Sequence, residues 1–390
     1  MTTWKDFLLN ASDDVESHFN RLKNRLITRL GTEKPYRIVY YRGFGSPTAV
    51  WLKGRVLRQR ELGGPSHGGP GDQDTFWQNL LATYQRFGSD KVTGVTVRIE
   101  AFEQSYTTVT DERGYFELTI DPPNDLPPGR AWFPVRYSLD GVVQPTTEVN
   151  PSQLITAEPV VKDGHLLIAP LYSQFGLVSD IDDTVLVTDA TNLLQTARLT
   201  FLGNAYTRLP FAGIAAFYRA LQSGPVTTLF NPIYFISSSP WNLYDLLVDF
   251  FRIQGIPKGP ILLRDFGLNR DLLSAQGHHT HKLAMIRKVL AVNPQLPFVL
   301  IGDSGQQDPE IYAQVVKENP GRIRAIYIRD VSEDRRDEAV RALIQLAEAG
   351  NVPMLLVTDT VAAAEHAASI GLIDPDTLPE IRADRRADEV

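Results

Sequence analysis

The stretch that decides the fold class is Val178-Ser179-Asp180-Ile181-Asp182-Asp183-Thr184. The apolar residues 175–178 run directly into two acids spaced i and i+2, with a hydroxyl residue two positions further on. Because side chains alternate along a strand, Asp180 and Asp182 are expected to point to the same side where the strand ends. Two carboxylates in that position can bind a hard cation and can share nucleophilic and acid/base work.

Three downstream segments also place polar side chains at the end or start of an apolar element. Residues 232–236 predict a buried strand that ends in three serines, and residues 298–301 predict another that ends in Gly302-Asp303-Ser304. Between these strands, Lys282 opens a segment with the apolar periodicity of a helix. Each residue alone is better explained as a helix cap, a turn residue or a surface side chain, but together they predict one site.

In this order and spacing, the four motifs resemble those of the haloacid dehalogenase superfamily of phosphotransferases. The surrounding sequence is similar to the actin-patch-type phosphatidate phosphatase family, and the resemblance covers roughly residues 35–330. The segments that carry it are 179–184, 237–244, 263–267, His281-Lys282 and 302–312. The resemblance implies a Mg²⁺-dependent phosphatase. It implies a lipid substrate less directly, because the motifs encode phosphoryl chemistry and not the leaving group.

The expected catalytic pair is Asp180, the nucleophile that would form an aspartyl-phosphate, and Asp182, the acid/base. Superfamily members that keep a phosphoenzyme waiting lack the second acid, so its presence favours a phosphatase. The expected ligands of Mg²⁺ are Asp180, Asp303 and the backbone carbonyl of Asp182. Lys282 would balance charge on the nucleophile and on the phosphoryl oxygens.

The remaining candidates surround this centre. Ser237 is expected to donate a hydrogen bond to the phosphoryl group, and Ser238 is the alternative, because the sequence does not fix the strand end to one residue. Asp308 is expected to orient metal-bound waters from outside the ligand set, and Thr184 is placed with it. Asp183 is better explained as a helix cap.

The chain divides into four predicted parts. Residues 1–34 predict an amphipathic helix that is basic in its second half, and residues 35–170 predict a mainly antiparallel β-sandwich, immunoglobulin- or transthyretin-like. In residues 171–375, strands alternate with helices as in an α/β haloacid dehalogenase-like parallel sheet domain. Residues 376–390 form a charged tail that is expected to fray. The N-terminal helix either docks on a domain, which is favoured, or lies on a membrane or between subunits.

Composition narrows the compartment and the partners. The 390 residues include no cysteine, which excludes disulfides and thiolate metal sites, and the net charge of −7 argues against nucleic acid as a partner. No apolar run approaches the ~20 residues that cross a bilayer, and the N-terminus shows no secretory pattern. We expect a cytoplasmic protein, with peripheral contact with a membrane left open; oligomeric state is not indicated.

The spacing of the motifs bears on the substrate. The stretches 184–237 and 242–282 are too short for a large cap domain besides the helices and strands expected there, so the site should be open to a bulky substrate. The leading hypothesis is a Mg²⁺-dependent phosphatase that hydrolyses a phosphomonoester, phosphatidate to diacylglycerol by resemblance. The alternatives are a phosphatase of a phosphoprotein or soluble phosphoester, and a non-enzymatic lipid-binding module. The pair of acids argues against the last of these.

Overall fold

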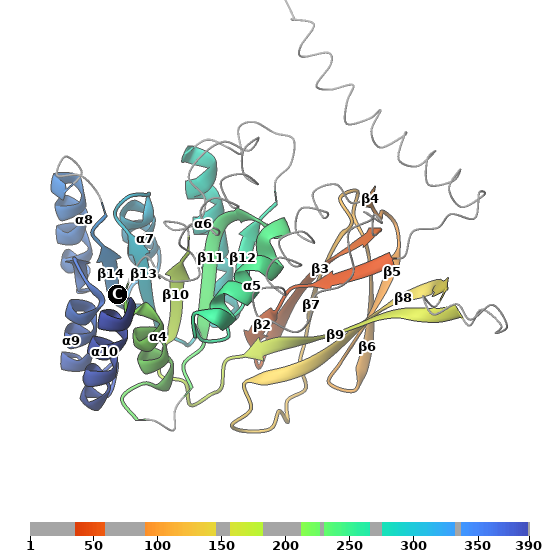
Figure 1. Cartoon of the computed structure of the whole chain (residues 1–390), viewed down its shortest axis with the longest axis horizontal. Helices are drawn as coiled ribbons and strands as arrows, with labels where there is room; N and C mark the ends of the chain where they lie inside the picture. The colour runs from red at the N-terminus through yellow and green to blue at the C-terminus, as the bar shows by residue number, and fades with distance from the viewer. Residues whose placement is uncertain are drawn as a thin grey trace, which may run out of the picture.

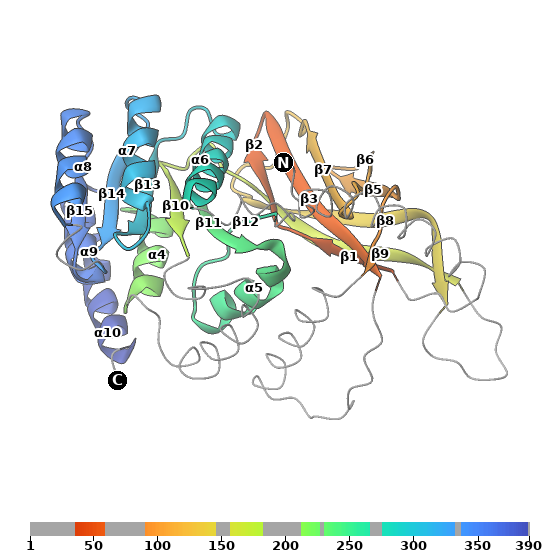
Figure 2. The same ribbon diagram turned by 90° about the horizontal axis from the view of Figure 1, so that it is seen from above.

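The computed structural model describes residues 36–58, 90–145, 157–181, 212–226, 230–265, 275–331 and 337–388. The predicted N-terminal helix lies outside these ranges, as do residues 184–211, 227–229 and 266–274 of the stretches considered for a cap. The described elements form two sheets side by side, one flanked by helices on both faces (Figures 1 and 2). None of the described helices combines the length and the apolar character needed to cross a bilayer.

The second half of the chain forms a six-stranded parallel sheet, as predicted. Its spatial order is β12-β11-β10-β13-β14-β15, and every pairing is parallel. The strands are β10 (Gly176–Asp180), β11 (Ile233–Pro240), β12 (Ile261–Arg264), β13 (Phe298–Asp303), β14 (Ile323–Arg329) and β15 (Met354–Val357). Their nearly continuous apolar runs suit a sheet covered on both faces. The strand order reverses between β10 and β13, and such a switch point is where parallel sheets bind ligands.

Helices cover both faces of this sheet (Figure 2). The first group is α6 (Ala275–Val292), α7 (Asp308–Glu318) and α8 (Asp337–Ala349), which pack in that order. The second group is α4 (Ile214–Ser223), α9 (Thr360–Ser369) and α10 (Leu378–Asp388), with the short η4 (Pro375–Thr377) before α10. After β11 the chain continues through η2 (Trp241–Leu243) into α5 (Tyr244–Ile253).

Three predicted boundaries are wrong. Lys282 does not open its helix, because α6 begins at Ala275 and the lysine lies inside it. Strand β11 does not end at Ile236; the three serines stay extended to Pro240, with a register shift against β12. Residues 378–388 are not a frayed tail. They form α10, whose Ile381 is 1 % exposed. Burial of this apolar side chain holds the helix against the domain although most of its residues are charged.

The first half of the chain forms a nine-stranded sheet that is antiparallel except where β2 pairs with β9, so the mainly antiparallel character is confirmed. Its main path runs β1-β3-β2-β9-β8-β5-β6, and β4 and β7 also pair with β3. The strands are β1 (Tyr36–Tyr40), β2 (Gly43–Ser46), β3 (Ala49–Arg58), β4 (Asp90–Lys91), β5 (Thr96–Ala101), β6 (Gln104–Val109), β7 (Tyr115–Ile120), β8 (Trp132–Pro145) and β9 (Ala157–Ile168).

This mixed sheet is continuous, whereas a sandwich has two separate sheets. Side chains of β3 and β7 nevertheless share one core with those of β5 and β8, so its two halves pack against each other. The immunoglobulin- or transthyretin-like topology stays a prediction.

Strand β3 joins the two halves of the molecule because its side chains alternate between two cores. Val50, Leu52 and Val56 face the core of the mixed sheet. Trp51 and Leu57 belong to the core of the parallel sheet. The two sheets therefore share a buried boundary.

Candidate active site

Asp180 ends β10, the strand beside the switch point of the parallel sheet. Its backbone pairs with Ile236 of β11 on one side, while β13 flanks β10 on the other. The same edge carries the ends of both neighbouring strands, because all three strands run parallel. Polar residues that follow β10, β11 and β13 are thus brought to one place, as the sequence predicted.

Lys282 reaches this edge from α6. Its Nζ lies 2.7 Å from Oδ1 of Asp180, and it donates hydrogen bonds to Oδ1 of Asp308 at 2.9 Å and to Oε1 of Gln306 at 3.2 Å. The lysine side chain is almost fully buried. A buried ammonium is stable only with such partners, so the location of Lys282 depends on the aspartates.

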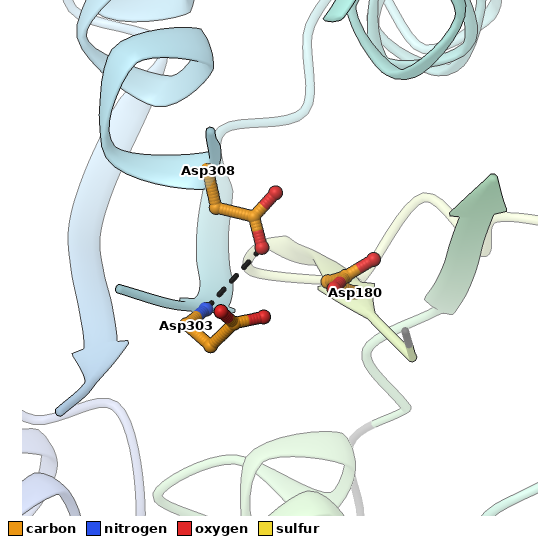
Figure 3. A group of neighbouring side chains, drawn as sticks. All are labelled: Asp180, Asp303 and Asp308. Carbon is orange, nitrogen blue, oxygen red and sulfur yellow. Dashed lines mark hydrogen bonds between the residues drawn. The ribbon is translucent and has the colours of Figure 1, made fainter. Parts of the chain in front are cut away.

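Asp303 ends β13 and turns the chain that follows it. Its Oδ1 accepts hydrogen bonds from the backbone N–H groups of Gly305 and Gln306, at 2.7 and 3.0 Å. This local turn fixes the carboxylate at the edge of the sheet. Its own N–H donates to Oδ2 of Asp308 at 3.2 Å (Figure 3).

Asp308 is the first residue of α7 and is fully buried. Burial, together with the charges of Asp180 and Asp303, raises the pKa of Asp308 well above its usual range, while Lys282 opposes this rise. The sequence placed Asp308 outside the metal ligands, but the structure brings it into the same cluster as the other two acids.

The three aspartates fit a hard cation. One carboxylate oxygen from each of Asp180, Asp303 and Asp308 lies within 4.8 Å of the others, and Figure 3 shows the three side chains converging. Oxygen ligands are those that Mg²⁺ and Ca²⁺ prefer. Three buried carboxylates facing one lysine leave excess negative charge, which a divalent cation would balance.

The serines that follow Ile236 are all buried within the extended end of β11. Ser237 lies one position beyond the residue that pairs with Asp180, and its Oγ accepts a hydrogen bond from the N–H of Ser239 at 2.9 Å. Both Ser237 and Ser238 lie at the predicted edge, and the choice between them for phosphate binding stays a prediction. Asp182 and Thr184 fall outside the described residues.

Two further residues at this edge of the sheet were not predicted from the sequence to be part of the site. Gln306 accepts a hydrogen bond from Lys282; its place in the polar run after Asp303 was the available signal. Gly302 lies so close to Asp308 that a Cβ atom at this position would be 2.5 Å from the carboxylate Oδ2 and 2.8 Å from the Asp308 Cβ. The glycine before Asp303 therefore makes room for Asp308.

The fold and the site define an α/β domain with a buried carboxylate–lysine cluster at the switch point of a parallel sheet. Residues 175–330 match the family described as "Phosphatidate phosphatase APP1, catalytic domain". The match covers β10 to β14 and all three aspartates of the cluster.

Two relatives extend the comparison. The phosphatidate phosphatase APP1 of Saccharomyces cerevisiae is 25 % identical over 76 % of this chain, and an uncharacterized protein of Schizosaccharomyces pombe is 28 % identical over 67 %. The matches cover 48 % and 42 % of those proteins, so the chain spans less than half of their lengths.

Solved structures offer weaker likenesses. A carbohydrate acetylesterase from Xanthomonas citri aligns over 88 % of this chain and 71 % of its own, at 10 % identity and a TM-score of 0.24. A protein of unknown function from Porphyromonas gingivalis aligns over 38 % of this chain and 60 % of its own, at 10 % identity and a TM-score of 0.18. Such scores carry no argument about fold or chemistry.

Proposed function

We propose that this protein is a Mg²⁺-dependent phosphatase with a haloacid dehalogenase-like catalytic domain. The observation that carries the proposal is the buried cluster of Asp180, Lys282, Asp303 and Asp308, which lies inside the segment that matches the phosphatidate phosphatase catalytic family. The order of the parallel strands, with β10 in the middle, supports an edge at which nucleophile, lysine and acids meet.

In the first step, a carboxylate oxygen of Asp180 attacks the phosphorus atom, and the bond from phosphorus to the leaving oxygen breaks. The leaving oxygen takes a proton from Asp182, which gives an alcohol and an aspartyl-phosphate. Ser237 or Ser238 donates a hydrogen bond to the phosphoryl oxygens, and Lys282 balances their charge.

In the second step, water attacks the phosphorus atom of the aspartyl-phosphate. The Asp182 carboxylate takes one proton from that water, and the bond between phosphorus and Asp180 breaks. The products are inorganic phosphate and the free Asp180 carboxylate, and Asp182 is protonated again for the next cycle.

The residues that would hold Mg²⁺ are Asp180 and Asp303, together with the backbone carbonyl of Asp182. Asp308 lies close enough to these acids to serve as a further ligand or to fix the waters around the ion. When bound, the ion supplies positive charge that lets an anionic carboxylate approach an anionic phosphate.

The substrate that the family match favours is phosphatidate, a phosphorylated lipid whose hydrolysis yields diacylglycerol. This choice rests on the name of the family and of the relative from Saccharomyces cerevisiae. A cytoplasmic location with peripheral contact at the membrane would bring such a protein to this substrate.

The test compares phosphate release from phosphatidate in detergent micelles, from p-nitrophenyl phosphate and from a phosphopeptide, each with Mg²⁺. Release from phosphatidate with the highest kcat/KM supports the proposal. A preference for either soluble substrate assigns a different phosphatase, and release from none of the three, with retained binding to phosphatidate vesicles, identifies a lipid-binding module. The Asp180→Asn variant serves as the blank for contaminating phosphatases.

A further inference from the structure

Strand β3 presents two buried cations, Lys53 and Arg55, to the domain that carries the proposed active site. Their residues are 8 % and 7 % exposed. They are spaced i and i+2 and follow Trp51, so all three lie on the face of β3 that packs against the parallel-sheet core. Charged side chains are seldom buried unless they are paired, so their partners show what this face holds in place.

Arg55 binds two segments at once. Its Nη1 donates to Oδ1 of Asn242 at 2.9 Å, and its Nε donates to the backbone carbonyl of Arg113 at 3.0 Å. The guanidinium carbon lies 4.5 Å from the centroid of the Tyr115 ring. A planar guanidinium can stack and donate in fixed directions. The contacts with Arg113 and Tyr115 therefore fix Arg55 to the mixed sheet. From there its guanidinium binds the side chain of Asn242.

Asn242 lies a short distance along the chain after Ser237 and Ser238, the serines proposed to bind phosphate, with Ser239, Pro240 and Trp241 between them. The chain from Ser237 to Trp241 is buried throughout, and the hydrogen bond between the N–H of Ser239 and Ser237 Oγ tightens it. Trp241 packs on Tyr41 of the first half of the chain, with 4.0 Å between ring centroids. Because this segment is short and buried, we expect a shift of Asn242 to be passed to Ser237.

Lys53 extends the same contact to two other segments around the cluster. Its Nζ lies 3.1 Å from Oδ2 of Asp265, just after β12, and 3.6 Å from Oε2 of Glu117 on β7. Glu117 also pairs with Lys288 at 2.8 Å. Lys288 belongs to α6, the helix that carries Lys282. The mixed sheet thus contacts the segments after β11 and β12 and the lysine-bearing helix.

From these contacts we infer that Arg55 is a positioning residue of the phosphatase site, acting through Asn242 on the end of β11 that carries Ser237 and Ser238. The mixed sheet is then part of the active-site architecture and not a separate module. This inference rests on the proposed function. Misplacement of a binding group by about 1 Å can cost about 100-fold in rate, so losing one hydrogen bond at the boundary can reduce turnover without unfolding the domain.

The test measures kcat, KM and the inhibition constant of inorganic phosphate, with p-nitrophenyl phosphate as substrate, for Arg55→Met, Asn242→Leu and the double variant. Each single variant should lower kcat by about tenfold or more and weaken inhibition by phosphate to a similar degree. The double variant should lose no more than the worse single one, because both remove the same contact.

Two further variants separate positioning from general damage. Asn242→Asp keeps an acceptor for the guanidinium and should lose less than Asn242→Leu. Arg136→Met removes an exposed ion pair with Asp163 elsewhere on the mixed sheet and should leave the kinetics unchanged. Circular dichroism and the thermal midpoint show whether each variant is folded.

Three results would overturn the inference: wild-type kinetics for Arg55→Met, additive losses in the double variant, or a loss explained entirely by less folded protein with phosphate inhibition unchanged. If the wild-type chain releases no phosphate from any substrate, the proposed function fails instead. Calorimetric titration of wild type and Arg55→Met with inorganic phosphate and Mg²⁺ then decides this inference. Equal affinities for phosphate, or no binding by either protein, would contradict the inference that Arg55 positions the phosphate-binding serines.

Discussion

The ammonium of Lys282 lies 2.7 Å from a carboxylate oxygen of Asp180, and both side chains are buried although they come from a helix and a strand far apart in the chain. The same ammonium donates to Asp308 at 2.9 Å. Lys282 is thus shared between the proposed nucleophile and a second acid. Loss of either aspartate leaves the lysine with one charged partner, whereas loss of the lysine leaves the aspartates facing one another.

Asp180→Asn is expected to abolish phosphate release and to keep the fold. The amide cannot act as the nucleophile and carries no charge for a cation, while Lys282 retains Asp308. Phosphate release and circular dichroism measure the two effects. Asp163→Asn, an exposed aspartate on the mixed sheet, is the matched control. More than a few per cent of wild-type activity in a clean preparation would remove Asp180 from the nucleophile role.

Lys282→Met is expected to inactivate the protein and also to destabilise it. Breaking a buried ion pair by removing one partner costs about 3–5 kcal/mol, and here Asp180 and Asp308 would both lose the ammonium that they share. Thermal unfolding in EDTA measures the loss. Mg²⁺ should restore more of the midpoint in this variant than in wild type. Lys317→Met, an exposed lysine in the last turn of α7, should unfold like wild type, and an equal effect of both substitutions would contradict the shared role of Lys282.

The sequence predicted the parallel sheet and the meeting of Asp180, Lys282 and Asp303 because strand ends follow from apolar runs and parallel strands bring those ends to one edge. It placed Asp308 beside the metal ligands, but it did not predict that a carboxylate oxygen of Asp308 lies within 4.8 Å of those of Asp180 and Asp303. That position depends on how α7 starts and on the space that Gly302 leaves, and both are tertiary features. The sequence did not predict α10, because the segment is mostly charged and Ile381, which is buried in the folded chain, does not stand out in it.

The same limit explains the boundary between the two sheets. The alternation in β3 marks two faces, but it does not say what the second face contacts. Nothing in the sequence indicates which residues Lys53 and Arg55 contact, and only the folded chain shows that they bind Asp265 and Asn242.

Removal of divalent cations with EDTA is expected to stop phosphate release, and Mg²⁺ should restore it better than Ca²⁺, which takes more ligands at longer distances. Asp303→Ala should raise the Mg²⁺ concentration that gives half-maximal activity, since one of the clustered carboxylates is lost. A titration of activity against each cation measures both effects. Full activity in EDTA would exclude a metal-dependent mechanism.

Gly302→Ala tests the packing beneath the cluster. Its new methyl group would lie 2.5 Å from Oδ2 of Asp308, so the carboxylate must move, and its hydrogen bonds from Lys282 and from the N–H of Asp303 should weaken. We expect a fall in kcat and a higher Mg²⁺ requirement. Gly350→Ala, at the end of α8 and away from the cluster, is the control. Wild-type Mg²⁺ dependence in Gly302→Ala would show that Asp308 can shift without consequence.

The C-terminal helix α10 should contribute to stability and not to catalysis. Oδ2 of Asp384 accepts a hydrogen bond from the backbone N–H of Ala216 at 3.0 Å. This N–H lies in the first turn of α4, and the N-cap residue Gly213 has no side chain that could accept its hydrogen bond. Losing such a cap costs typically about 1 kcal/mol.

Asp384→Ala should therefore lower the thermal midpoint, as followed by circular dichroism, with kcat and KM unchanged at a temperature well below it. Glu380→Ala, a substitution that is also on α10, removes an exposed ion pair with Arg219 of α4 and should change the stability by less than about 0.5 kcal/mol. If Asp384→Ala and Glu380→Ala unfold at the same temperature, the contact with α4 does not hold α10 in place. If Asp384→Ala reduces kcat in the fully folded protein, α10 contributes to catalysis and this prediction is wrong. Its position beyond the matched family segment does not suggest such a role.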